Sequence, residues 1–291
     1  MKKKLNWRKI AFLVCAAVFL VSGALLVRDL VISSQERAAN ERLAEMVRAS
    51  RGGTDPGVSA PAGEGVGLLD GAARPVFPKY AASGLLYQYD ALYNMNQDMA
   101  GWIYVEDTKI DYPVMFTPDD PEYYIHRGFD KNYAASGCLF IGANSAPDGS
   151  NVLIYGHHMK DGSMFAGIMK YADAKFARAH SVIHFDTLTE EGSYEVVAAF
   201  YTKAYTSKFQ YQKYTDLTQE ETFDSYIRQV RRSAAYDSGV EVSFGDQLLT
   251  LSTCSYHADY GRFVVVARRI PEETGETAAG ETAESAPAEK K

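Results

Sequence analysis

The residues of this sequence that could perform chemistry gather around one cysteine near its C-terminal end. Cys254 closes the run Leu248–Thr253 and is followed by Ser255. Side chains on a strand alternate between its two faces, so we expect Cys254 at the C-terminal end of a strand, on the same face as Ser252. A thiol becomes a strong nucleophile when a neighbouring base or cation favours the thiolate. The sequence therefore predicts a nucleophilic cysteine whose partners come from other strands.

The cationic partner is expected in the same hairpin. Arg262 opens the apolar run Phe263–Ala267, after the seven-residue connection Ser255–Gly261. If the two runs pair as an antiparallel hairpin, the end of the first meets the start of the second. Cys254 and Arg262 then face each other. A guanidinium does not lose its proton at ordinary pH, so Arg262 cannot be a base, but its donors can hold an oxyanion.

Three histidines could act as the base. His157 follows the run Val152–Tyr155 through Gly156, so it also stands at the end of a strand, and His158 is its neighbour in the chain. Adjacent residues at a strand end point in different directions, so only one of the two can face Cys254. His257 lies three residues after the cysteine. The spacing alone leaves these alternatives open.

The remaining cysteines and histidines indicate no further chemistry. Three cysteines, Cys15, Cys138 and Cys254, make a disulfide framework unfavourable, although a Cys138–Cys254 bond stays possible. His180 and His184 have the spacing of a helical metal pair, but the residues around them read as a strand. In a strand the two would lie about 13 Å apart. We therefore expect no metal site and no organic cofactor.

Elements that must position these residues follow residue 84. Eight short β-rich runs, each bounded by turn-forming residues, cover residues 102–105, 112–115, 138–141, 152–155, 182–185, 194–201, 248–253 and 263–267. Their number and spacing predict a mainly β fold, a closed or nearly closed barrel. A capping box at Thr218–Glu221 and apolar residues at helical spacing predict a helix of about four turns, ending near Ala235, before the last two strands.

The N-terminus carries a membrane signal. A basic cluster in residues 1–9 precedes the uncharged apolar run of residues 10–27. At about 1.5 Å per residue this run reaches roughly 27 Å, close to the thickness of the bilayer core. The basic cluster should stay in the cytoplasm, which places the rest of the chain outside the cell as a single-pass membrane protein. A cleaved signal peptide is the alternative.

Composition divides the remaining chain. Residues 28–83 are expected to form a stalk and linker: residues 33–50 are rich in helix formers, and residues 51–61 combine glycine, proline and serine. The folded domain is expected at residues 84–270. Residues 271–291 form an acidic tail that cannot bury enough apolar surface to order itself. The net charge of −7, without a basic patch beyond the N-terminus, argues against nucleic acid as a partner.

Three motifs together resemble the class B sortases of Gram-positive bacteria. They are IYGHHMKDGSMF at residues 154–165, TLSTC at residues 250–254 and RFVV at residues 262–265, with D-x-x-GWI from Asp98 near the start. The resemblance covers about residues 87–270. It implies an eight-stranded sortase barrel with an N-terminal helical region and the late inserted helix. It also assigns His157, Cys254 and Arg262 to the catalytic positions and sets Ser252 and Thr253 near the bound substrate.

The same resemblance implies a function. Such an enzyme is a cysteine transpeptidase that cuts a C-terminal sorting signal of a secreted protein and joins the protein to a peptidoglycan precursor amine. A thioester on the cysteine links the two steps. Three alternatives remain: a sortase that polymerises pilins through a lysine amine, a cysteine peptidase in which water resolves the acyl-enzyme, and a surface binding domain without catalysis.

Overall fold

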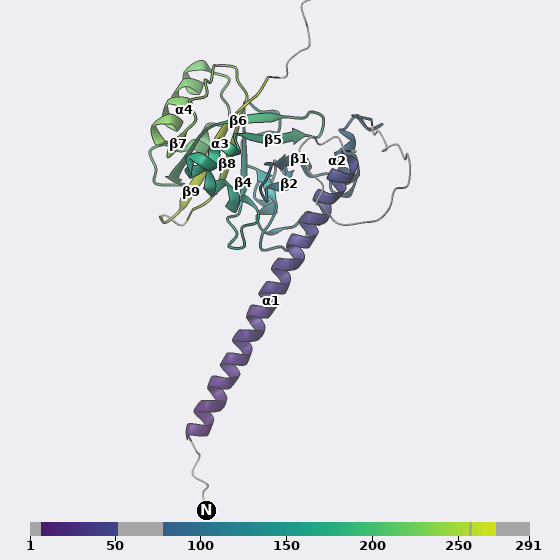
Figure 1. The fold of residues 1–291 in the computed structure, drawn as a ribbon, viewed down its shortest axis with the longest axis vertical. Coiled ribbons are helices and arrows are strands. Elements are labelled where there is room, and N and C mark those ends of the chain that lie inside the picture. The colour runs from purple at the N-terminus through teal and green to yellow at the C-terminus, as the bar shows by residue number, and fades with distance from the viewer. Residues whose placement is uncertain (1–6, 52–77, 256–257, 272–291) are drawn as a thin grey trace, which may run out of the picture.

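A closed β-barrel is the main part of the folded domain in the computed structural model, which describes residues 7–51, 78–255 and 258–271 (Figure 1). Eight strands form a ring in the order β5-β1-β2-β3-β4-β8-β9-β6, which closes because β6 also pairs with β5. The short strand β7 pairs with β6 outside this ring. The ring confirms the predicted mainly β fold with an eight-stranded barrel.

All eight predicted runs coincide with strands. The strands are β1 Met99–Tyr104, β2 Asp111–Met115, β3 Leu139–Ile141, β4 Asn151–Gly156, β5 Val182–Thr187, β6 Ser193–Lys203, β7 Tyr236–Asp237, β8 Leu248–Cys254 and β9 Gly261–Arg269. The predictions differ from these bounds by up to three residues. Strand β7 was not predicted, because a strand of two residues has no alternation to detect.

The inside of the barrel is filled by alternate residues from every strand of the ring. One buried cluster includes Ile103, Val114, Ile141, Ile154, Phe185, Val196, Leu251 and Val265, with Phe165, Ile168 and Tyr171 from the 3-10 helix η2 (Phe165–Ala172). The short helix α3 (Ala174–Ala179) follows η2. Because successive side chains point to opposite faces, the intervening residues of the same strands lie on the outside of the barrel.

Helices cover two parts of that outside. Helix α4 (Glu220–Ser233) buries Phe223, Tyr226 and Val230 against the outer residues of β6, β8 and β9. Elsewhere, helix α2 (Tyr87–Met95) and the end of the N-terminal helix pack with Trp102, Met115 and Phe140 of β1, β2 and β3. Two short 3-10 helices, η1 (Tyr123–His126) and η3 (Tyr211–Lys213), lie in the connections.

The inserted helix is present, but its predicted cap is wrong. Helix α4 begins at Glu220, and the residue before it, Gln219, makes no side-chain capping hydrogen bond. The hydroxyl of Thr218 instead donates to Asp216 Oδ1 at 2.6 Å. The amide of Thr218 donates to the same carboxylate oxygen at 3.0 Å, so Asp216 holds the threonine in the turn before the helix.

One uninterrupted helix joins the predicted span to the predicted stalk. Helix α1 (Trp7–Ser50) leaves the barrel as a long rod (Figure 1). Within the described residues it is the one helix long and apolar enough to cross a membrane. The most apolar 18-residue stretch of this helix has a mean hydropathy of 2.3 and packs against no other part of the protein.

The other end of α1 is part of the folded domain. Leu43, Ala44 and Val47 are buried against α2 and β2. The Arg51 guanidinium, one residue beyond the helix, lies 3.0 Å from Asp186 Oδ2, and this carboxylate is almost completely buried. The expected stalk is thus packed on the folded domain, with its buried apolar residues in the last two turns of α1. Residues 1–6, the linker at 52–77 and the tail at 272–291 lie outside the described residues.

Candidate functional site

Three neighbouring strands bring the predicted catalytic residues to one end of the barrel. Strand β8 lies between β4, which runs parallel to it, and β9, which runs antiparallel. Gly156 of β4 is level with Thr253 of β8, so the next residues, His157 and Cys254, are also level. Across the hairpin, Cys254 pairs with Arg262. The nucleophile candidate therefore lies between the histidine and the arginine.

Cys254 and Arg262 form the more closely spaced of the two kinds of residue pair in an antiparallel ladder. The next pair along the hairpin is bonded, since the Ser255 amide donates to the Gly261 carbonyl at 2.9 Å. Bonded and non-bonded pairs alternate along an antiparallel ladder, so Cys254 and Arg262 form a non-bonded pair, in which the side chains approach most closely. Opposed Cβ atoms in such pairs are about 4.5–5.5 Å apart. The register of the sheet therefore places the stems of the two side chains beside each other.

Both side chains lie on the outer face of the barrel, above a chain of hydroxyl groups. Alternation from the inward-facing Leu251 turns Ser252 and Cys254 outward. The hydroxyl of Ser252 is 2.7 Å from that of Tyr211, which is also bonded to Tyr155. Burial raises the pKa of both tyrosines, while the positive charge of Arg262 acts in the opposite direction. The hydroxyls therefore stay protonated and polar beneath the candidate site.

His157 is held by the connection that precedes β3. Its Nε2 donates to the carbonyl of Ile125 at 2.7 Å, and its ring stacks on His126 with centroids 5.3 Å apart. Because a carbonyl can only accept, the neutral ring carries its proton on Nε2 and leaves Nδ1 as the nitrogen able to take up a proton. Burial lowers the pKa of His157, and repulsion from His126 and Arg262 adds to this effect, against the bond to Ile125.

The rival histidines have different surroundings. The Nδ1 of His158 donates to the backbone carbonyl of Cys254 at 3.1 Å, so its ring contacts the main chain of the cysteine. His257 lies outside the described residues. Of the two histidines that the structure describes at this end of β4, His157 continues the outward-facing series that includes Tyr155.

Ser252 and Thr253, predicted to lie near a bound substrate, are both buried. Ser252 contacts Tyr211, as described above. Thr253 faces the other side of β8, and its hydroxyl donates to the carbonyl of Gly156 at 2.8 Å. This bond ties the end of β8 to the end of β4, directly before Cys254 and His157. In this structure both residues support the site from within, and their contact with a substrate stays a prediction.

The other candidate ligands and thiols lie elsewhere. Cys138 is buried and unbonded, and burial raises the pKa of its thiol to about 12. Cys15 is exposed on the apolar part of α1. His180 donates to the carbonyl of Glu106 at 3.0 Å, and Nδ1 of His184 in β5 lies 3.1 Å from Ser193 Oγ of β6. Among the described residues no three His, Cys, Asp or Glu side chains converge as a metal centre.

The sequence did not point to three neighbours of the site. Tyr155 could have been found, because it lies two residues before His157 and therefore on the same face. His126 and Tyr211 belong to 3-10 helices in long connections. Such segments have no periodicity that relates them to a strand far away in the sequence, so their contacts required the structure.

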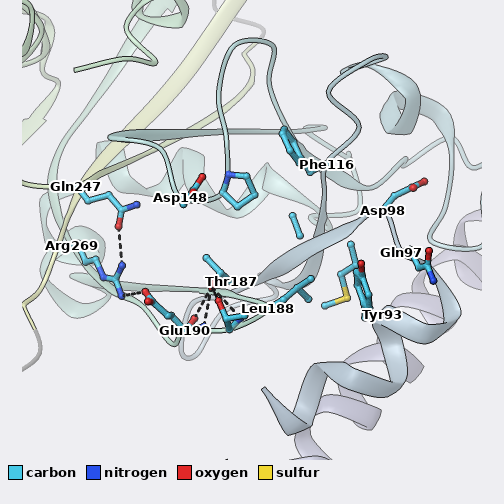
Figure 2. Close-up of a pocket in the computed structure, with 14 residues that line it drawn as sticks. Tyr93, Gln97, Asp98, Phe116, Asp148, Thr187, Leu188, Glu190, Gln247 and Arg269 are labelled. Atoms are coloured by element: carbon cyan, nitrogen blue, oxygen red, sulfur yellow. Dashed lines mark hydrogen bonds and ion pairs between the residues drawn. The ribbon is translucent and has the colours of Figure 1, made fainter. Parts of the chain in front are cut away.

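Some open cavities of the protein lie away from this site. One of about 660 Å³ lies at the opposite end of the strands, before β8 and after β9. There Arg269 donates to Gln247 and Glu190 at 3.0 and 3.1 Å, with Tyr93 on the other side of the cavity (Figure 2). The seven residues of β8 separate this cavity from Cys254 by about 23 Å.

Comparisons with known proteins agree with this arrangement. The family model described as the sortase domain matches residues 103–270. A curated sortase B of Listeria monocytogenes is 35% identical over 183 residues, which are 62% of this chain and 72% of that protein. A crystal structure of sortase B from Bacillus anthracis is 32% identical, with a TM-score of 0.57 over 64% of this chain and 85% of that one.

A further solved structure shares the fold over a longer stretch. It is a sortase B–substrate complex from Staphylococcus aureus, 24% identical, with a TM-score of 0.66 over 82% of this chain and 98% of that one. Its longer coverage includes part of the chain before the family match. With the family match over more than half of the sequence, these findings establish that the chain belongs to the sortases and, within them, to class B.

Proposed function

We propose that this sortase is a membrane-anchored cysteine transpeptidase that uses Cys254 as nucleophile, His157 as acid and base, and Arg262 as the oxyanion donor. Its substrate is a secreted protein with a C-terminal sorting signal, and the acceptor is an amine of a peptidoglycan precursor. The observation that carries the proposal is that Cys254 and Arg262 pair on the adjacent strands β8 and β9, while His157 directly follows the neighbouring strand β4.

The first half of the reaction forms a thioester. The Cys254 thiolate adds to the carbonyl carbon before the scissile bond, and the guanidinium of Arg262 donates to the oxyanion that develops. When the tetrahedral intermediate collapses, the C–N bond breaks. Protonated His157 gives its proton to the leaving amine.

The second half transfers the acyl group. The acceptor amine attacks the thioester carbonyl and loses a proton to His157, which becomes protonated again. The C–S bond breaks, and the thiolate of Cys254 is restored. Each cycle therefore replaces one amide bond by another and leaves the enzyme unchanged.

The test uses the full chain in detergent micelles with a library of sorting-signal peptides and candidate amines, and mass analysis of the products. We expect a peptide–amine product, a thioester on Cys254 when no amine is present, and no turnover after Cys254→Ala. His157→Ala should abolish turnover, whereas His158→Ala serves as the matched control. Turnover by Cys254→Ala would refute the mechanism, and release of free acid alone at saturating amine would identify a peptidase instead.

We also propose that α1 crosses the cell membrane once, with its basic N-terminus in the cytoplasm and the barrel outside. The length and apolar character of the helix and the basic residues before it support this orientation. Protease added to intact protoplasts should remove the barrel and leave a protected N-terminal fragment. Complete protection of the barrel would contradict the orientation.

A further inference from the structure

One face of α1 makes polar contacts with the barrel domain just beyond the apolar part of the helix. Ser33, Glu36, Arg37 and Asn40 have the spacing i, i+3, i+4 and i+7, so they lie on a single face. All four contact segments that are about 100 or more residues away in the sequence. These segments are the two that adjoin His157.

The first segment is the connection between η1 and β3. The carboxylate of Glu36 accepts the amides of Ala135 and Ser136 at 2.8 and 3.1 Å. In the same connection, the Ala134 amide donates to the His126 carbonyl at 3.1 Å. His126 stacks on the ring of His157, and the carbonyl of the preceding residue, Ile125, accepts the proton on His157 Nε2. Glu36 thus holds the far end of the segment that holds the histidine ring.

The second segment begins at His157 itself and runs to Phe165, whose amide donates back to the His157 carbonyl at 3.0 Å. Its tip is Asp161, whose Oδ2 accepts from Arg37 Nη1 at 3.0 Å and from Ser33 Oγ at 3.1 Å. Burial acts to raise the pKa of Asp161, but the hydrogen bonds and Arg37 outweigh it and lower that pKa. The carboxylate is therefore charged and fixed to α1 at neutral pH.

The same helix face therefore ties down the segment that contains His157 and the segment that contacts its ring. We propose that residues 33–40 of α1 are a positioning element for His157, so that the membrane-anchoring helix completes the catalytic site. This proposal rests on the role given to His157 above. A helix is stiff over two turns, so it fixes the spacing between the two segments that it contacts.

Loss of these contacts should not detach the helix. Leu43, Ala44 and Val47 are buried in the domain, and the ion pair between Arg51 and Asp186 lies beyond them. These contacts are about two to four turns away from Glu36 and involve different neighbours. Substitutions at Glu36 or Arg37 therefore loosen the two segments near His157 while α1 stays docked.

The experiment compares Glu36→Gln and Arg37→Gln with the wild type, as full chains in micelles. The control is Glu41→Gln, on the same helix, whose carboxylate bonds to Arg48 within α1. We measure kcat, KM and their pH profiles with a sorting-signal peptide, and follow the titration of the His157 ring by NMR. Active-site titration with a thiol reagent corrects for inactive protein.

We expect both glutamine variants to lower kcat tenfold or more, with KM within twofold, and to shift the acidic limb of the kcat profile and the His157 titration together. Glu41→Gln should match the wild type. Arg37→Lys should restore most of the activity, because the contact with Asp161 is through a single nitrogen that an ammonium can replace.

The inference is overturned if the glutamine variants keep the wild-type kcat. It is also overturned if only the fraction of active enzyme falls, while the pH profile of kcat and the His157 titration stay unchanged. The NMR titration decides the question even if no peptide is turned over. A wild type without transpeptidation refutes the proposed function, whereas a wild type with activity and insensitive variants refutes this inference alone.

Discussion

Replacement of Arg262 by lysine separates the charge of this side chain from its hydrogen-bonding geometry. Both residues are cationic and have long stems, but only the guanidinium has a planar fork of donors. The register holds Arg262 beside Cys254 in a closely spaced pair. A shorter ammonium with one point of contact cannot keep the same donors aimed at an oxyanion that forms at the thiol.

The magnitude follows from the role as an oxyanion donor. Loss of one preorganised donor in other acyl-transfer enzymes costs about 10²–10³ in kcat, or about 2.7–4 kcal/mol. We expect Arg262→Lys to fall in this range for thioester formation. The fold should tolerate the change, because Arg262 is half-buried and its guanidinium donates to the carbonyl of its own neighbour, Gly261. The free energy of unfolding should change by no more than about 0.5 kcal/mol.

The assay is rapid-quench measurement of thioester formation with a sorting-signal peptide, on the full chain in micelles. Arg268→Lys is the matched control, since Arg268 lies on the same strand and the same face, about 20 Å away, where it pairs with Glu195 at 3.4 Å. It should react within twofold of the wild type. If Arg262→Lys forms the thioester within threefold of the wild-type rate, Arg262 is not the oxyanion donor.

Three other predictions concern single groups. The pKa of His157, measured by NMR, should lie below about 6.5 and should rise in Arg262→Gln. Because the pKa is lowered in the folded protein, the contribution of His157 to the free energy of unfolding is present above about pH 6.5 and is lost as the pH falls through the folded pKa. Asp186→Asn should destabilise the fold by about 3–5 kcal/mol in urea titrations, since it breaks a buried ion pair. A water-soluble alkylating reagent should modify Cys254 and spare the buried Cys138, as read by peptide mass mapping.

Much of the barrel and the pairing of Cys254 with Arg262 could be predicted from the sequence, for a simple physical reason. Alternation fixes which side chains share a face, and hairpin pairing fixes which strand ends meet. These two rules were enough to bring Cys254 and Arg262 together, as the observed register confirms. The parallel neighbour β4 was harder, because parallel strands are joined by long connections that carry no signal of their register. The choice of His157 over His158 therefore depended on the motif.

The contacts of α1 with the barrel domain could not be predicted from the sequence. Residues 33–50 are rich in charge and in helix formers, which is also the composition of a solvated stalk. Nothing in the pattern distinguishes a glutamate that faces water from one that, like Glu36, accepts two backbone amides about 100 residues away. Leu43 and Val47 have helical spacing, but two apolar residues one turn apart are common on helices that pack against nothing.

These contacts of α1 come from residues before the domain boundary that the sequence predicts. A domain boundary at Gly84, drawn from composition alone, separates the barrel from the helix end that buries Leu43 and from the Arg51 guanidinium that neutralises Asp186. It also removes the carboxylate that secures the segment beside His157. A fragment that starts there retains Cys254, His157 and Arg262, but it leaves the buried Asp186 carboxylate without its cationic partner and loses both ties to α1. The helix that we propose as the anchor and the proposed active site are thus parts of one packed structure, in which α1 contacts both segments that adjoin His157.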